Sequence, residues 1–173
     1  MYGKNHEVLE RVFGKNKFSV AEVEKLSFEK EKRYQEGYFP HLALIEGLDK
    51  FLDRASAKNI AMAIGSAAIP FNIDFVVDGL NIRSYLAAIV SADDVTISKP
   101  DPETFLKAAA ALNVAPAACL VFEDTPKGVE SAWNAGMKCI VLTTTHQVAE
   151  FSDYNNILGY ITDYNDEKLN SLF

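Results

Sequence analysis

Four polar side chains follow short apolar runs of the sequence and could together bind a phosphoryl group. The run that ends at Phe122 is followed by two adjacent acids, Glu123 and Asp124. Ser66 follows an earlier apolar run, and Lys99 follows another at a greater distance. A hydroxyl and an ammonium group can bind phosphate oxygens, and a carboxylate can hold the Mg²⁺ ion that neutralises phosphate charge. The set therefore predicts phosphoryl chemistry with Mg²⁺.

Each of these residues also has an ordinary structural interpretation. Ser66 could cap a turn or a helix, and Lys99 could be a solvent-exposed lysine. Asp124 could be the N-cap of the following helix, with Glu123 solvated beside it. The phosphoryl interpretation is favoured by the order of the residues, which recur at the ends of successive apolar runs.

The elements that would position these side chains are typical of βαβ units. Short apolar runs predict strands at 60–64, 88–90, 119–122 and 139–142, with a weaker one at 160–162. Amphipathic segments predict helices at 45–57, 70–80, 102–112 and 129–135. This alternation indicates an α/β fold with a Rossmann-like parallel sheet covered by helices on both faces. The carboxyl ends of parallel strands share one edge of a sheet, where ligands bind.

The first part of the chain has a different, helical pattern. Two helices are expected within residues 1–39, with a turn near residues 14–16. Ser19 and Glu22 have the spacing of a capping box at the start of the second helix. The charged run at 29–33 is expected to be a solvated helix face. The division into domains is expected at Phe39, which gives a helical part, 1–39, and an α/β core, 40–173.

Charge and composition exclude several classes of partner and compartment. The 173-residue chain has a formal net charge of -7, which argues against a nucleic-acid-binding or anionic-membrane-binding surface. No apolar stretch reaches the roughly 20 residues that a membrane span needs. Cys119 and Cys139 lie in separate apolar runs and are expected to be thiols in a reducing compartment. A cytoplasmic protein is therefore expected.

The segments around these side chains resemble the haloacid dehalogenase-like superfamily. Within it, they look like the branch of β-phosphoglucomutases and small sugar-phosphate phosphatases that carry a helical cap. The resemblance rests on Ser66, on Lys-Pro-Asp-Pro-Glu-Thr-Phe at 99–105, and on the segment 121–137, which begins Val-Phe-Glu-Asp-Thr-Pro-Lys-Gly. It implies an α/β core of this family at 40–173 and a cap remnant at 1–39.

The resemblance also implies roles for individual residues. Ser66 and Lys99 would bind the phosphate, Asp124 would be a Mg²⁺ ligand, and Glu123 would lie beside the metal. Three cap residues would reach toward the substrate: Lys4, His6 and Lys30. For Lys30, a solvated position on the helix remains the favoured interpretation.

The family's nucleophile is missing from this sequence. In the family, the first strand carries an Asp-x-Asp motif, whose first Asp forms an aspartyl-phosphate and whose second is the general acid and base. The sequence contains no Asp-x-Asp, and its first Asp, Asp49, falls within an expected helix. We therefore expect the sequence to begin within the cap, without the first core strand, and to be a truncated, inactive form.

The absent strand would be central in the family's sheet, between the strand that leads to Ser66 and the strand that ends at Glu123. Unpaired backbone groups are costly when they are buried. We therefore expect these two strands to pair directly, a second copy to fill the gap through self-association at the sheet edges, or the fold to be marginal. A single chain with an open gap in its sheet would contradict this expectation.

The function that follows is a Mg²⁺-dependent phosphohydrolase for a small phosphorylated metabolite such as a hexose phosphate. Two alternatives remain at this point: a phosphohexomutase, and a non-catalytic protein that binds a phosphorylated ligand. The mutases carry a Ser, a Lys and an Asn after the phosphate-binding serine, whereas this chain has Ala-Ala-Ile-Pro at 67–70. That difference favours the phosphatase.

Overall fold

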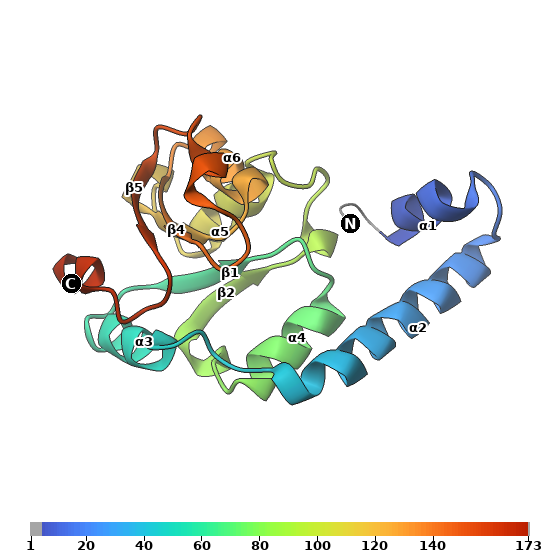
Figure 1. Ribbon diagram of the computed structural model, residues 1–173, viewed down its shortest axis with the longest axis horizontal. Coiled ribbons are helices and arrows are strands. Elements are labelled where there is room, and N and C mark those ends of the chain that lie inside the picture. Colours follow the sequence, from blue (N-terminus) through green and yellow to red (C-terminus); the bar gives the residue numbers. More distant parts are fainter. Residues whose placement is uncertain (1–4, 173) are drawn as a thin grey trace.

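A computed structural model describes residues 5–172 of the chain and the side chains of residues 8–172. Helices alternate with parallel strands from residue 48 onward (Figure 1). The helices are α1 (Asn5–Phe13), α2 (Val20–Tyr38), α3 (Leu48–Ala57), α4 (Pro70–Gly79), α5 (Glu103–Ala111) and α6 (Pro126–Asn134). The strands are β1 (Met62–Gly65), β2 (Leu86–Val90), β3 (Leu120–Glu123), β4 (Lys138–Leu142) and β5 (Ile157–Ile161). The predicted α/β class with parallel strands is therefore confirmed, with bounds that differ by a few residues.

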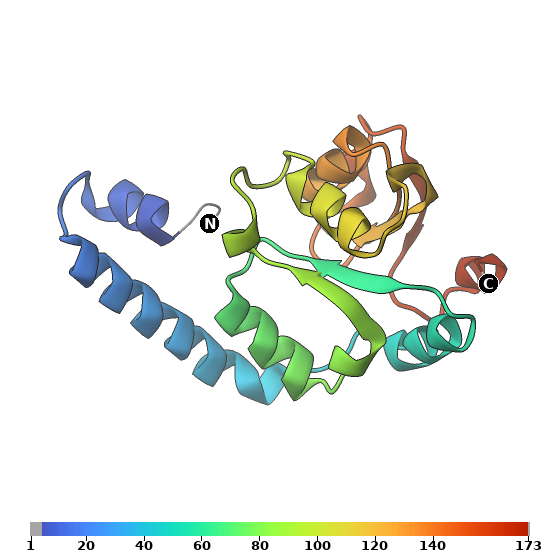
Figure 2. The same ribbon diagram turned by 180° about the vertical axis from the view of Figure 1, so that it is seen from behind.

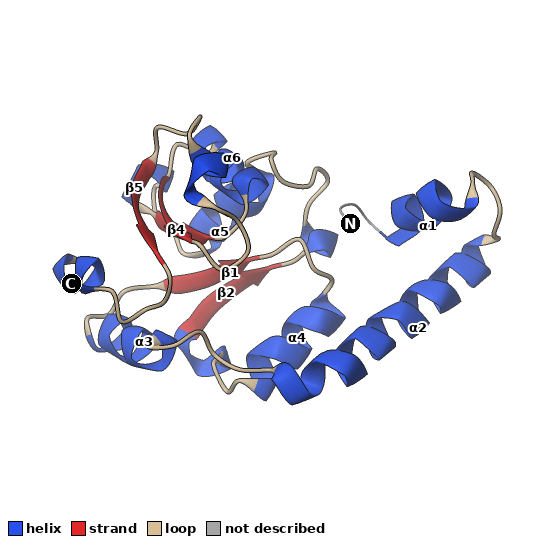
Figure 3. Ribbon diagram, in the orientation of Figure 1, coloured by secondary structure: helices blue, strands red, loops and turns tan. Residues whose placement is uncertain are grey.

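The strands form two separate parallel sheets (Figure 3). One contains β1 and β2, with Gly65 opposite Val90 at the end of the ladder. The other has the order β3-β4-β5, with Glu123 opposite Val141. Within each sheet the strands run the same way, so their carboxyl ends lie together and place polar residues at one edge.

The expected direct pairing of the strands that lead to Ser66 and Glu123 is wrong. Those strands, β1 and β3, belong to different sheets, and self-association of a second copy at the sheet edges stays a prediction. The premise that both strands must be buried does not hold for β1, although Val121 in β3 is buried. Every residue of β1 is only partly buried, and Ile60 just before it is 47% exposed. A backbone edge that water can reach needs no strand partner.

The two N-terminal helices form an arm beside the core. α1 lies alongside α2 in both views, and the far end of α2 reaches α4 (Figures 1 and 2). The capping box of α2 is present, with Ser19 and Glu22 exchanging hydrogen bonds. Within residues 5–172, no helix is both long enough and apolar enough to span a bilayer.

One residue in this arm contradicts the sequence interpretation. The charged run 29–33 was expected to be solvated, yet Glu31 is only 6% exposed. It is buried because the side of α2 that carries it faces α4, from which Asn72 donates a hydrogen bond to its carboxylate. Periodicity within a helix does not reveal which neighbour covers a given face.

Two apolar clusters pack against the β3-β4-β5 sheet, one on each face. On one side α5 and α6 pack against it, with Val129, Ala132 and Cys139 fully buried. On the other side α3 and the C-terminal segment contribute Phe51 and Leu169. Burial raises the pKa of the Cys139 thiol to about 12, so this cysteine stays protonated at neutral pH.

Candidate active site

A buried ion pair joins the ends of the two sheets. The Lys99 ammonium donates one hydrogen bond to the carbonyl of Gly65, at the end of β1, at 3.1 Å. It donates another to Oε1 of Glu123, at the end of β3, at 2.5 Å. The two charged side chains are 12% and 10% exposed, and the ring of Phe105 lies 4.3 Å from the ammonium. The side chain of Lys99 thus connects the ends of β1 and β3, which were expected to be joined by backbone hydrogen bonds.

The carboxylate of Glu123 is held by the start of α6. Its Oε2 accepts hydrogen bonds from the backbone N–H groups of Asp124 and Thr125 and from the Thr125 hydroxyl, at 3.1, 3.2 and 3.1 Å. Thr125 is the N-cap of α6 and accepts from the backbone N–H of Gly128. A carboxylate at a helix N-terminus is also favoured by the helix dipole. These contacts fix Glu123 as the residue that positions Lys99.

Gly128 allows this arrangement. A Cβ atom at residue 128 would overlap the carboxylate of Glu123. A side chain here would displace the Glu123 carboxylate from its contacts, which explains the glycine in the Thr-Pro-Lys-Gly sequence that follows the two acids.

Asp124 is reached from the loop after β4. The Thr145 hydroxyl oxygen lies 3.1 Å from Oδ2 of Asp124 and 3.1 Å from the backbone carbonyl oxygen of the same residue, and it can donate a hydrogen bond to either. Nδ1 of His146 lies 3.0 Å from the same carbonyl. Thr145 belongs to the run of threonines after this strand, which was recognised as a polar strand end but was not named among the site residues, and His146 was not predicted.

Ser66 is oriented by the turn that begins α4. Its oxygen accepts a hydrogen bond from the backbone N–H of Ala68 at 3.0 Å, and its own N–H donates to the carbonyl of Val90 at 2.8 Å. This contact uses a lone pair of the oxygen and not the hydroxyl proton, which can donate to a ligand. Ser66 lies in the wall of a cavity of about 530 Å³, within the range of small-molecule sites.

The structure brings Ser66, Lys99, Glu123 and Asp124 to the carboxyl ends of β1 and β3, as the order of the motifs suggested. Lys30 lines the same cavity as Ser66, where its ammonium pairs with Glu31 at 2.7 Å. Lys4 and the side chain of His6 lie outside the described residues. Roles in substrate binding for these cap residues stay predictions.

Glu103 holds the loop that carries Lys99. Its carboxylate accepts hydrogen bonds from the backbone N–H groups of Thr96 and Ile97, at 2.8 and 2.9 Å, and pairs with Lys107 at 2.7 Å. The hydrogen bond from Lys107, followed by that from Ile97, lowers the pKa of Glu103 to about 2. Glu103 was seen in sequence only as part of a motif, so its role in the loop is a structural finding.

The stability that Glu103 contributes is expected to depend on pH. Its pKa is lower in the folded protein than the ordinary 4.5, so its contribution is complete above about pH 4.5 and is lost as the pH falls toward 2. Glu103→Gln is therefore expected to unfold at lower urea concentration than the unchanged protein at pH 6, with the difference shrinking toward pH 2. Glu167→Gln, at an exposed position, is the control. A difference that stays constant from pH 6 to pH 2 would contradict this assignment.

Comparison with known proteins places the chain in a family. Residues 2–142 match the model of the haloacid dehalogenase-like hydrolases. The chain is 30% identical over 124 residues to validoxylamine A 7'-phosphate phosphatase of Streptomyces hygroscopicus subsp. limoneus, covering 72% of this chain and 58% of that protein. It is 38% identical over 79 residues to the fructose-1-phosphate phosphatase YqaB of Escherichia coli, covering 46% of this chain and 42% of that protein.

A solved structure shows a similar fold. The crystal structure of β-phosphoglucomutase from Clostridium difficile superposes with a TM-score of 0.81 at 24% identity, covering 98% of this chain and 75% of that one. The chain spans between 38% and 58% of the length of the first curated relatives it matches. The activities of those longer proteins are therefore proposed, and not shown, for this chain.

Proposed function

Because the chain belongs to the haloacid dehalogenase-like hydrolase family, we propose that it forms the phosphate- and Mg²⁺-binding part of a phosphatase. The substrate class is a small phosphorylated metabolite, with a hexose phosphate as the leading example. Relatives named as phosphatases of phosphorylated sugars or sugar-like compounds support this class.

The observation that carries the proposal is the buried Lys99–Glu123 pair next to the Ser66 turn. A nearly buried ammonium costs free energy to desolvate, and Glu123 holds it in one place. Lys99 donates to the carbonyl of Gly65, so its ammonium contacts the backbone of the residue directly before Ser66. Together they would bind phosphate oxygens and stabilise the charge on a transferring phosphoryl group.

The donor set near Asp124 fits Mg²⁺ rather than a metal with many protein ligands. No cluster of three His, Cys, Asp or Glu side chains suited to a metal occurs within the part of the chain described. Mg²⁺ is usually bound through one or two carboxylates together with substrate phosphate and water. Asp124, oriented by Thr145, would hold the ion, which when bound would neutralise charge on the phosphate oxygens.

The covalent step of the family would need a carboxylate that this sequence does not contain, since it has no Asp-x-Asp motif. We therefore propose that residues 1–173 bind the phosphorylated ligand without turning it over. The mutase alternative predicts a requirement for a sugar bisphosphate, whereas residues 67–70 offer no polar side chain for a second phosphate. A cytoplasmic location remains part of the proposal.

Calorimetric titration with inorganic phosphate in the presence of Mg²⁺ tests the proposal. The unchanged chain is expected to bind phosphate, and Ser66→Ala is expected to bind it about tenfold more weakly, because one hydrogen bond to a charged oxygen is lost. Ser84→Ala, at an exposed serine, is the control. Absence of phosphate binding, or equal binding by Ser66→Ala, would overturn the assignment. Release of phosphate from a hexose phosphate by the unchanged chain would overturn the proposal that it does not turn over its ligand.

A further inference from the structure

The loop after β4 brings two side chains onto Asp124, the residue proposed to hold Mg²⁺. Nδ1 of His146 lies 3.0 Å from the backbone carbonyl oxygen of Asp124 and 2.9 Å from the hydroxyl oxygen of Thr145. That hydroxyl oxygen lies 3.1 Å from the same carbonyl oxygen and 3.1 Å from Oδ2 of the Asp124 carboxylate. Asp124 is therefore held at its backbone and at its side chain by two successive residues of one loop.

The imidazole ring of His146 is supported from the core. It packs edge-to-face on Phe151, with 6.1 Å between the ring centroids and 73° between the ring planes. Phe151 is fully buried, and a side chain in a close-packed interior has little freedom to move. His146 itself is only half-buried. The core thus supports the ring while its Nδ1 edge lies against Asp124.

The hydrogen-bond partners assign the proton of each group. The carbonyl and the ionised carboxylate of Asp124 can only accept hydrogen bonds. An Nδ1 without a proton would place two acceptors 3.0 Å apart, so Nδ1 of His146 is assigned as an N–H donor. It then cannot accept from Thr145, whose hydroxyl proton goes to Oδ2 of Asp124, because a charged acceptor gives the stronger hydrogen bond. The Nδ1–H form of His146 therefore directs the Thr145 hydroxyl to the carboxylate.

This arrangement leaves the other carboxylate oxygen of Asp124 available to a cation. Within residues 5–172, no side chain or backbone group donates a hydrogen bond to Oδ1 of Asp124. Mg²⁺ requires near-octahedral geometry and is usually bound through only one or two carboxylates, so the direction of a single carboxylate matters. Residues that orient a metal ligand typically change metal affinity by about 10–100-fold.

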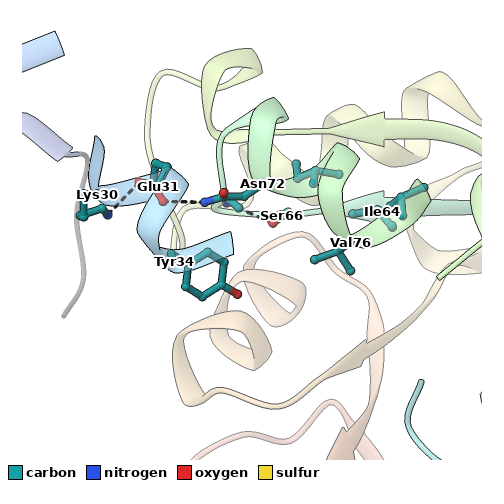
Figure 4. A pocket seen from close by; sticks show the side chains of 10 residues that line it. Lys30, Glu31, Tyr34, Ile64, Ser66, Asn72 and Val76 are labelled. Atoms are coloured by element: carbon teal, nitrogen blue, oxygen red, sulfur yellow. Dashed lines mark hydrogen bonds and ion pairs between the residues drawn. The ribbon is translucent and has the colours of Figure 1, made fainter. Parts of the chain in front are cut away.

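We propose that His146 is a positioning residue for Mg²⁺ binding. Its Nδ1–H group holds the Asp124 backbone and makes Thr145 fix the Asp124 carboxylate, with Oδ1 left for the ion. The inference rests on the proposed function, because it takes Asp124 as the ligand of that ion. Ser66, in the wall of the cavity shown in Figure 4, has its own hydrogen-bond partners. Phosphate binding without Mg²⁺ is therefore expected to be independent of His146.

Calorimetric titration of the whole chain with inorganic phosphate, at one pH and over a series of Mg²⁺ concentrations, tests the inference. The unchanged chain is expected to bind phosphate more tightly as Mg²⁺ is added, because two ligands that favour each other do so reciprocally. His146→Phe keeps an aromatic ring next to Phe151 and removes the donor. It is expected to need about tenfold more Mg²⁺ for the same gain in phosphate affinity. In EDTA, it is expected to bind phosphate like the unchanged chain.

A conservative variant separates positioning from packing. In His146→Asn, the amide nitrogen takes the place of Nδ1 while the ring contact with Phe151 is lost, so a nearly normal dependence on Mg²⁺ is expected. A normal His146→Phe together with an impaired His146→Asn would mean that only ring packing matters, and would overturn the inference. His41→Phe makes the same change at an exposed histidine outside the site and is expected to behave like the unchanged chain.

Two measurements test the link through Thr145. Thr145→Val is expected to raise the Mg²⁺ requirement by about the same factor as His146→Phe, and the double variant by no more than either alone, because both act on one hydrogen bond. Losses that multiply in full would contradict this link. In NMR spectra that correlate ring protons with ring nitrogens, the unchanged chain is expected to show a protonated Nδ1 at His146. A proton on Nε2 alone would overturn the assignment.

The same titrations distinguish failure of this inference from failure of the proposed function. If the unchanged chain binds no phosphate with or without Mg²⁺, the proposed function fails, and the inference fails with it. If phosphate binds but Mg²⁺ does not tighten it, the Mg²⁺ part of the proposed function fails. If Mg²⁺ tightens phosphate binding equally in the unchanged chain and in His146→Phe, the proposed function stands and only the role of His146 is refuted.

Discussion

Replacing Lys99 with Met is expected to lower the free energy of unfolding by about 3 kcal/mol and to remove detectable phosphate binding. The substitution leaves Glu123 as a buried charge without its cation, a change that typically costs about 3–5 kcal/mol. A loss of stability at the lower end of this range is expected because three donors at the start of α6 still contact the Glu123 carboxylate. Urea unfolding measures the first effect, and calorimetric titration with inorganic phosphate measures the second.

Two further variants test whether the effects of Lys99→Met are specific to this lysine and its ion pair with Glu123. Lys138→Met removes an exposed lysine at the start of β4 and is expected to change stability by less than about 0.5 kcal/mol. The double variant Lys99→Met/Glu123→Gln removes the uncompensated charge, so it is expected to be more stable than Lys99→Met alone while still failing to bind phosphate. A Lys99→Met protein with unchanged stability and unchanged phosphate affinity would refute both roles of the lysine.

Replacing Gly128 with Ala is expected to destabilise the protein by about 2 kcal/mol, although the same change in a helix usually stabilises by about 0.5–1 kcal/mol. A loss of stability is expected here because the new Cβ would overlap the Glu123 carboxylate. A displaced Glu123 releases Lys99, so weaker phosphate binding is expected as well. Urea unfolding and phosphate titration on the same preparation measure both effects.

Gly159→Ala is the matched control for this substitution. The nearest atom to a Cβ at residue 159 is Cδ of Lys168 at 3.7 Å, an ordinary contact, in strand β5. Its stability is expected to change by less than about 0.5 kcal/mol. If Gly128→Ala is as stable as Gly159→Ala, the start of α6 has room for a side chain, and Glu123 is not confined as described.

Much of the local structure could be predicted because its causes are local. Ser19 and Glu22 form the capping box that their spacing indicated, and the N-cap of α6 is Thr125, one residue after Asp124, which the sequence suggested for that role. Both depend on contacts between residues three apart, which a sequence pattern contains. The apolar runs similarly predicted the strands, because a strand buried on both faces, such as β4 from Cys139 to Leu142, reads as a continuous apolar segment.

Failures of the sequence interpretation concern contacts between distant segments. Glu31 looked like part of a solvated helix face, and only Asn72, 41 residues later in the chain, shows why it is buried. The position of Thr145 beside Asp124 likewise depends on how β4 lies next to β3. Residue spacing contains no information about which helix or loop will cover a given side chain.

The sequence by itself determined the family, the alternation of elements and the identity of the phosphate-site candidates, because each follows from short motifs and hydrophobic periodicity. Only the tertiary structure decided that β1 and β3 lie in separate sheets and that the side chain of Lys99 joins their ends. It also decided that Glu31 faces the cavity of Ser66. These outcomes depend on the balance between burial, solvent access and charge pairing across distant segments, which is settled only when the whole chain packs.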